Sequence, residues 1–249
     1  MVIVKTEKDI AAIKEAVRIW KIAREAIYKQ AKAGVSLKEL DLLAKEVIEA
    51  NGGIAAFHNY LGFKGHICIS VNECVIHGVP TDYVLKDGDK VTFDVGVKYD
   101  NHYCDAAFTI IINNSNVEAL KISEICKKSI DEAVAIIKPK VTTHAISNAI
   151  QKFIEKNGYF VLRDFAGHGC GNEIHEDPLI PNYRSLLYRN VTLEENMVIC
   201  IEPMILSGSN AYYIDPNDQW SVKSKNHQMT CHWEHMILIT KDGCEVLTD

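Results

Sequence analysis

The sequence lacks several features that define familiar protein classes. No run of about 18 consecutive apolar residues occurs, so no membrane-spanning helix is expected. The first ten residues, MVIVKTEKDI, do not resemble a secretory signal peptide. Basic residues are not in excess, because 27 Lys and Arg stand against 33 Asp and Glu, a net charge of −6. This balance argues against direct nucleic-acid binding.

Paired cysteine motifs and linkers are also missing. None of the eight cysteines forms a CxxC pair, so a structural zinc ribbon is not expected. Free thiols in a chain without a recognisable signal peptide are typical of a reducing compartment, so we predict a cytoplasmic location and isolated, buried cysteines. No Pro/Ser-rich linker divides the 249 residues. We therefore predict one catalytic domain over residues 1–249.

Two helices are predicted near the N-terminus. Thr6 begins a capping-box pattern, and apolar residues follow at helical spacing up to Ile27. Ser36 begins a second pattern of the same kind, which Asn51-Gly52-Gly53 stops. Each of these helices is expected to bury one apolar stripe.

The same order of two helix patterns and a strand pattern recurs 106 residues later. Helices are predicted at about 117–137 and 143–156, and the strand pattern at 91–96 falls on that at 197–202. We therefore predict an α+β fold with internal pseudo-symmetry, in which helices cover one face of an antiparallel sheet.

The two predicted halves run over about 1–112 and 113–249. Similar halves that face each other create a cleft, which is a common place for a functional site.

The first candidate site residues are a pair of aspartates in a predicted hairpin at 90–112. With a two-residue loop at Tyr99 and Asp100, Asp94 lies directly opposite Asp105 on one face. Opposed carboxylates need a cation or a shared proton when they are buried. The alternative is that both are solvated surface carboxylates.

A second group of candidate residues lies in the other half. The Gly-rich motif at 166–178 contains His168 and His175. Glu202 ends an apolar strand, and Glu234 lies within the predicted final strand at 231–240. Each glutamate could also be an ordinary solvated carboxylate, but a buried one requires a partner.

Two aspartates, one histidine and two glutamates form an oxygen-rich ligand set with one imidazole. Such sets suit Mn, Fe, Co or Zn rather than a thiolate zinc site. Four carboxylates carry about the charge that two divalent ions require, and ion pairs of this kind hold a bridging water or hydroxide.

At this point the chain resembles the type I methionine aminopeptidases, which have the pita-bread fold. The resemblance covers nearly the whole chain, and its order and spacing are specific. It rests on VIHGVP (75–80), DVGVKYDNHYCDAA (94–107), GHGCGNEIHEDP (167–178), IEPM (201–204) and WEH (233–235).

The resemblance implies two divalent metal ions, for which Co, Mn, Fe, Zn and Ni are candidates. The implied metal ligands are Asp94, Asp105, His168, Glu202 and Glu234. Asp105 and Glu234 would bridge both ions, and Glu202 would also handle the proton of the attacking water. His77 and His175 would face the substrate and stabilise the tetrahedral intermediate.

The family's methionine pocket maps onto Tyr60, Phe63, Cys68 and Trp220, together with the two substrate-facing histidines. Phe63 stands where a tyrosine is often found, Phe57 where a cysteine can occur, and Ile174 where an aromatic residue can occur. These departures concern the shape of the pocket rather than the chemistry.

The resemblance further implies a monovalent cation near Asn72, bound through backbone oxygens at positions that Asn72, Cys74 and Thr230 match weakly. It implies a compact bacterial form, a monomer, and nascent polypeptide N-termini at the ribosome as the partner. The implied function is removal of the initiator methionine by hydrolysis of the first peptide bond.

Two other functions fit parts of the pattern. Proline-directed relatives, such as aminopeptidase P or prolidase, share the five ligands but usually carry an extra N-terminal domain. A non-catalytic pita-bread protein that binds nucleic acid or ribosomes typically loses ligands. Neither alternative fits the pattern as well as a methionine aminopeptidase.

Overall fold

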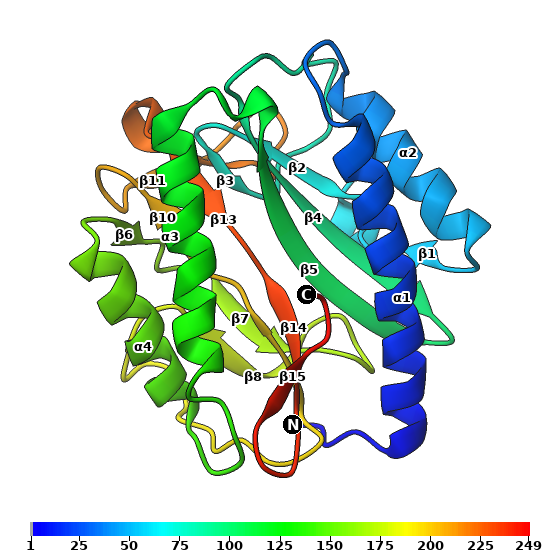
Figure 1. Cartoon of the computed structure of the whole chain (residues 1–249), viewed down its shortest axis with the longest axis vertical. Coiled ribbons are helices and arrows are strands. Elements are labelled where there is room, and N and C mark those ends of the chain that lie inside the picture. Colours follow the sequence, from blue (N-terminus) through cyan, green and yellow to red (C-terminus); the bar gives the residue numbers. More distant parts are fainter. Residues whose placement is uncertain (1) are drawn as a thin grey trace.

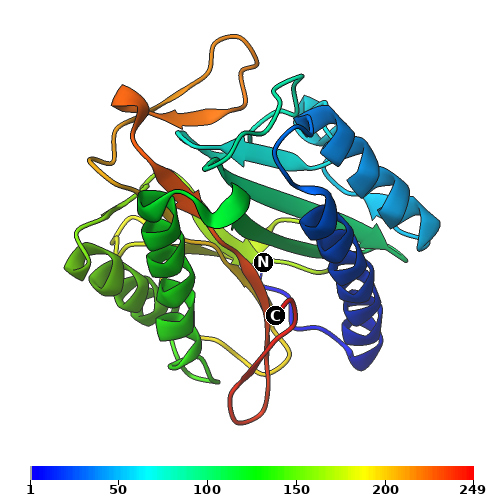
Figure 2. The same cartoon turned by 45° about the horizontal axis from the view of Figure 1, so that its top comes forward.

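The computed structural model describes residues 2–249, in which two helix pairs flank a set of antiparallel strands (Figure 1). The first pair consists of α1 (Glu7–Gln30) and α2 (Leu37–Ala50). The second consists of α3 (Val117–Val134) and α4 (Thr143–Lys156). When the molecule is turned, β13 and β14 still run between the two pairs (Figure 2).

The predicted helix starts are confirmed, because the capping signals act locally. The side chains of Thr6 and Ser36 accept hydrogen bonds from the backbone N–H three residues on, and both capping boxes are complete. The helix predicted to reach about residue 137 ends at Val134 and continues as a turn before Pro139, since the residue that precedes a proline disfavours helical backbone.

The strands form four hydrogen-bonded sheets rather than one continuous sheet. The first sheet contains β1 (Ile54–Ala55), β2 (Cys68–Val71), β4 (Lys90–Tyr99) and β5 (His102–Ile111). The second contains β6 (Phe160–Val161), β10 (Met204–Leu206) and β13 (Thr230–His232). The third contains β3 (Cys74–Ile76), β11 (Tyr212–Ile214) and β12 (Val222–Ser224). The fourth contains β7 (Ala166–Gly169), β8 (Glu176–Pro181), β9 (Val198–Ile201), β14 (His235–Ile239) and β15 (Cys244–Val246).

The predicted register of the β4–β5 hairpin is wrong by one residue at the turn. The loop residues are Asp100 and Asn101, so Asp94 lies opposite Ala107 and Asp105 lies opposite Gly96. Both loop residues have positive φ, 43° and 58°, which a primed two-residue turn requires and which Asp and Asn tolerate better than Tyr. The shift moves each partner by two positions, so Asp94 and Asp105 still share one face as diagonal neighbours.

The spacing of 106 residues recurs among the elements. Helices α2 and α4 begin at Leu37 and Thr143, and strands β1 and β6 begin at Ile54 and Phe160. Each second helix is also preceded by an isolated antiparallel bridge, from Ser36 to Val84 and from Thr142 to Thr192. We propose on this basis that the chain is a single domain built from two related halves.

Strand β9 carries side chains into both of the large apolar cores. Val198 and Cys200 pack with the core that includes α1 and α2, whereas Ile199 and Ile201 pack with the core that includes α3 and α4. Because successive side chains of a strand point to opposite faces, β9 lies between the two cores. It therefore brings the following residue, Glu202, to the middle of the molecule.

All eight cysteines are free thiols, and seven of them are buried, as predicted. Across the described part of the chain, no helix is both long and apolar enough to cross a membrane.

Candidate metal centre

Four strands and one break between strands position the five candidate ligands. Asp94 lies on β4, Asp105 on β5 and His168 on β7, while Glu202 directly follows β9. The prediction that Glu234 lies within a continuous strand is wrong. Trp233 and Glu234 separate β13 from β14.

The break at Glu234 has a structural reason. The backbone of Glu234 forms two hydrogen bonds with Ala107 of β5, its N–H donating at 2.9 Å and its carbonyl accepting at 3.3 Å. Neighbouring His232 belongs to the second sheet, and His235 belongs to the fourth. The chain thus passes from one sheet to another at Glu234, with its carboxylate near Asp105.

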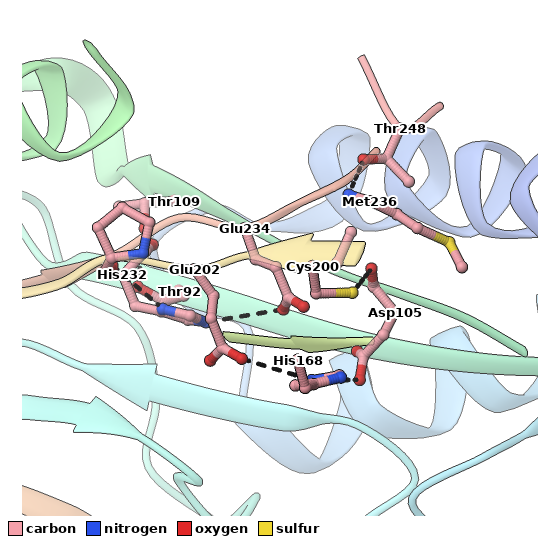
Figure 3. A network of polar contacts seen from close by, with 12 residues as sticks. Thr92, Asp105, Thr109, His168, Cys200, Glu202, His232, Glu234, Met236 and Thr248 are labelled. Atoms are coloured by element: carbon pink, nitrogen blue, oxygen red, sulfur yellow. Dashed lines mark hydrogen bonds and ion pairs between the residues drawn. The ribbon is translucent and has the colours of Figure 1, made fainter. Parts of the chain in front are cut away.

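The five side chains converge on one place. His168 Nε2 lies 3.4 Å from Glu202 Oε1 and 4.0 Å from Asp105 Oδ2, and the three side chains point toward one another (Figure 3). Ligand atoms of Asp94, Asp105 and Glu234 lie within 4.8 Å of one another. The structure therefore brings together all five residues that the sequence singled out.

The backbone fixes the protonation of the His168 ring. Its Nδ1 lies 2.9 Å from the carbonyl oxygen of Gly169, to which it can donate only as N–H. Burial lowers the pKa of His168 to about 3, so the ring is neutral near pH 7. Its Nε2 therefore presents a lone pair toward Glu202 and Asp105, as a metal-ligating imidazole does.

The carboxylates of the cluster lack protein partners for their charge. Burial raises the pKa of Asp94 to about 7, and burial together with the neighbouring carboxylates raises the pKa of Asp105, Glu202 and Glu234 well above their usual values. Buried oxygens of Asp94, Asp105 and Glu234 have no hydrogen-bond partner. Orphaned, clustered carboxylate oxygens beside an imidazole lone pair fit divalent cations.

Two further histidines line the same cavity, His77 after β3 and His175 before β8. Burial lowers the pKa of His77 to about 4 and also lowers that of His175. The Tyr60 hydroxyl lies 2.9 Å from His175 Nδ1. The ring centroids of His175 and His168 lie 4.4 Å apart, so His175 borders the cluster of candidate ligands, and His77 lines the same cavity.

The cavity has an apolar side next to the ligands. The space is about 150 Å³, which suits one side chain. Its lining includes every predicted pocket residue: Tyr60, Phe63, Cys68, His77, His175 and Trp220. Phe57, Phe63, Cys68 and Ile174 form one buried apolar cluster, against which Tyr60 and Trp220 pack.

Three residues in or beside the site were not predicted from the sequence: Leu61, Gly96 and His232. Leu61 lines the cavity from an exposed loop, where no pattern in the sequence marks it. A Cβ on Gly96 would lie 2.6 Å from the Phe57 ring, so the absence of a side chain there lets Phe57 cover β4. Buried His232 lies 3.9 Å from Glu234, and its place in the segment CHWEH could have drawn attention to it.

The chain is similar to known proteins over its whole length. Residues 11–241 match the model of metallopeptidase family M24. The chain is 43% identical over its whole length to the entire methionine aminopeptidase of Mycoplasmoides gallisepticum. It is 38% identical to methionine aminopeptidase 1 of Bacillus subtilis, with all of this chain and 99% of the relative covered. The crystal structure of methionine aminopeptidase from Rickettsia prowazekii superimposes over the full length of both chains with a TM-score of 0.95, at 32% identity.

The chain therefore belongs to metallopeptidase family M24, which implies divalent metal ions, and it has the pita-bread fold, a mixed α+β fold. Within this family it resembles the methionine aminopeptidases over its full length, as the sequence motifs indicated. A prolidase from Pyrococcus furiosus shares the fold with a TM-score of 0.79 at 26% identity, but this chain covers only 65% of that protein.

Proposed function

We propose that the protein removes the initiator methionine from newly made polypeptides by hydrolysing their first peptide bond. The main support is a single cavity in which an apolar pocket adjoins five clustered metal-ligand side chains. Full-length similarity to methionine aminopeptidases supplies the identity of the side chain that would fill the pocket.

Asp94, Asp105, His168, Glu202 and Glu234 would hold two divalent ions. When bound, such ions would supply Lewis acidity and would activate a water molecule near neutral pH. Asp94, Asp105 and Glu234 each bring a buried oxygen that lacks a protein partner and that a cation could satisfy. The ligand set accepts Co, Mn, Fe, Zn or Ni.

The chain's own residues would orient the substrate. The wall formed by Phe57, Phe63 and Trp220 would receive the methionine side chain. If the Tyr60 hydroxyl donates to His175 Nδ1, the proton of that ring lies on Nε2 and is available to the scissile carbonyl. Neutral His77 and His175 could then each donate one hydrogen bond to the developing oxyanion.

Glu202 would move the proton. Its carboxylate lies at the edge of the ligand cluster with 9% of the residue exposed, and burial raises its pKa. An ionised carboxylate beside the attacking water can take its proton and pass it to the leaving amine. Glu202 would thus combine metal binding with general acid–base catalysis.

The partners follow from the same proposal. The substrates would be nascent polypeptide N-termini that emerge from the ribosome in the cytoplasm, met by a monomeric enzyme.

The test is peptide hydrolysis by protein that has been stripped with a chelator and reloaded with one metal at a time. We expect release of methionine from Met-Ala-Ser, no activity without metal, and negligible cleavage of Gly-Pro. Preferential cleavage of Gly-Pro would instead favour a proline-directed enzyme. Absence of hydrolysis by fully metal-loaded protein would favour a binding protein.

A further inference from the structure

A lysine without a carboxylate partner is completely buried at the start of β4. Lys90 has no solvent exposure, and its Nζ donates to the carbonyl oxygens of Ser70 at 3.2 Å and Cys74 at 2.9 Å. No Asp or Glu oxygen in residues 2–249 forms an ion pair with it. Buried lysines are rare unless they are paired, so these carbonyl groups must replace the lost hydration.

These two carbonyl oxygens come from β2 and β3. Together with Asn72 O in the turn between the two strands and the hydroxyl oxygen of Thr230, they form a group that we call the oxygen cage. The hydroxyl oxygen of buried Thr230, on β13, lies 2.8 Å from Asn72 O and 2.9 Å from Cys74 O. Cys74 O therefore faces both this hydroxyl and the Lys90 ammonium. Asn72 is itself fixed, since its side-chain oxygen accepts from the Lys90 backbone N–H at 3.0 Å.

Converging backbone carbonyl oxygens are the ligands that select Na⁺ or K⁺ in proteins. The sequence resemblance implied such an ion near Asn72, Cys74 and Thr230. The residues present do not fit that expectation, because a lysine side chain already reaches Cys74 O. A second cation sharing this oxygen would be repelled by the ammonium in a buried, weakly screened position.

We propose that the Lys90 ammonium is the resident cation of this cage and that the protein takes no Na⁺ or K⁺ there. Burial lowers the pKa of Lys90, and the thiols of Cys231 and Cys74 and the carboxylate of Glu73 act against this shift. The carbonyl oxygens stabilise the charged form, because they accept hydrogen bonds from it.

The position of the ammonium gives it a structural role beside the candidate active site. Strand β2 begins at Cys68, which lines the apolar pocket, and β3 leads directly into His77. Strand β13 ends two residues before Glu234. Lys90 is thus a positioning residue that joins the pocket strands, and Thr230 connects them to the strand that precedes a candidate ligand. This inference does not depend on the proposed function.

The experiment measures thermal unfolding in choline chloride at constant ionic strength while NaCl or KCl replaces the choline salt. We expect the unfolding midpoint of the wild-type protein to stay the same. Lys90→Met should unfold at a lower temperature, and Na⁺ or K⁺ should raise its midpoint again in a saturable way, since the emptied cage can accept an ion.

Two variants serve as controls. Lys5→Met removes another buried lysine, which pairs with Glu176 rather than with carbonyls, so its lowered midpoint should not respond to Na⁺ or K⁺. Lys90→Arg retains a positive charge and should be as indifferent to both ions as the wild type. If Lys90→Met does not fold, the response of the Lys90→Arg unfolding midpoint to Na⁺ and K⁺ still tests the proposal.

A saturable rise of the wild-type midpoint with Na⁺ or K⁺ would overturn the proposal, because an inorganic ion would then occupy the cage. A folded Lys90→Met variant that ignores both ions would also overturn it, since the cage would then not bind cations.

Discussion

At the scale of single residues, Glu202 would connect the metal centre to proton transfer, because its Oε1 lies 3.4 Å from His168 Nε2 within the cluster of candidate ligands. Glu202→Gln keeps the shape and one oxygen but loses the group that takes a proton. We expect kcat for Met-Ala-Ser to fall by about 10²–10⁴-fold, the usual range for general acid–base catalysis.

Metal content and the unfolding midpoint of Glu202→Gln must be measured with kcat, to separate lost proton transfer from lost metal. Glu194→Gln, the same substitution at an exposed position eight residues earlier, is the matched control and should be fully active. Undiminished turnover by metal-loaded Glu202→Gln would rule out the proton-transfer role.

A second prediction concerns Asp94 and the pH dependence of the stability of the metal-free protein. Burial raises its pKa in the folded state to about 7 from the ordinary value of 3.8. The folded state therefore holds the proton more tightly than the unfolded state, and stability falls as the pH rises from about 4 to about 7. Above that range Asp94 contributes no further change.

Asp94→Asn removes this titration. In the presence of a chelator, its free energy of unfolding should fall less steeply with pH than that of the wild type, so the variant gains relative stability at pH 8. Asp105, Glu202 and Glu234 still titrate and leave a residual slope. Urea unfolding from pH 4.5 to pH 8 measures the difference, and parallel curves would refute the assignment.

At the scale of elements, the sequence predicts the start of a helix where local interactions determine it. It does not predict the end of a strand where contacts between distant segments determine it. The helix starts at Thr6 and Ser36 follow from capping within four residues. The break at Glu234 does not, because it depends on hydrogen bonds to Ala107, far away in the chain. The buried ion pair of Lys5 with Glu176 and the carbonyl contacts of Lys90 likewise join distant segments, and no periodicity marks them.

The candidate ligands were predictable for a different reason. Asp94 and Asp105 share a face in either hairpin register, because the true register differs by an even shift. The turn itself was misplaced, since alternation alone cannot show which two residues have positive φ.

The turn supports a third prediction. Asn101 has a φ of 58° at an exposed position, where a β-branched residue is strained by about 1–2 kcal/mol. Asn101→Val should therefore lower the free energy of unfolding by about this amount, whereas Asn101→Gly should not lower it, because glycine accepts this conformation. Equal stability of both variants in chemical denaturation would contradict the Asp100–Asn101 turn.

At the scale of the whole molecule, the candidate metal centre joins the two proposed halves. Asp94 and Asp105 come from strands that pack beneath α1, whereas His168, Glu202 and Glu234 come from the second half of the chain. Without metal, burial and repulsion between neighbouring carboxylates raise the pKa of Asp105 and Glu234. Bound cations would reverse this repulsion and hold the halves together.

A fourth prediction follows. Adding a divalent metal to chelator-treated protein should raise its stability by about 2.7 kcal/mol for each ion bound when the free metal is 100 times the dissociation constant of that ion. Hydrogen exchange should slow in β4 and β5 and also in β9 and β14, because ligands are drawn from both halves. Asp105→Asn should lose most of this response, whereas Asp87→Asn, at an exposed position, should keep it. Protection confined to one half would mean that the metal binds without joining the halves, and the two-half description of the site would then be wrong.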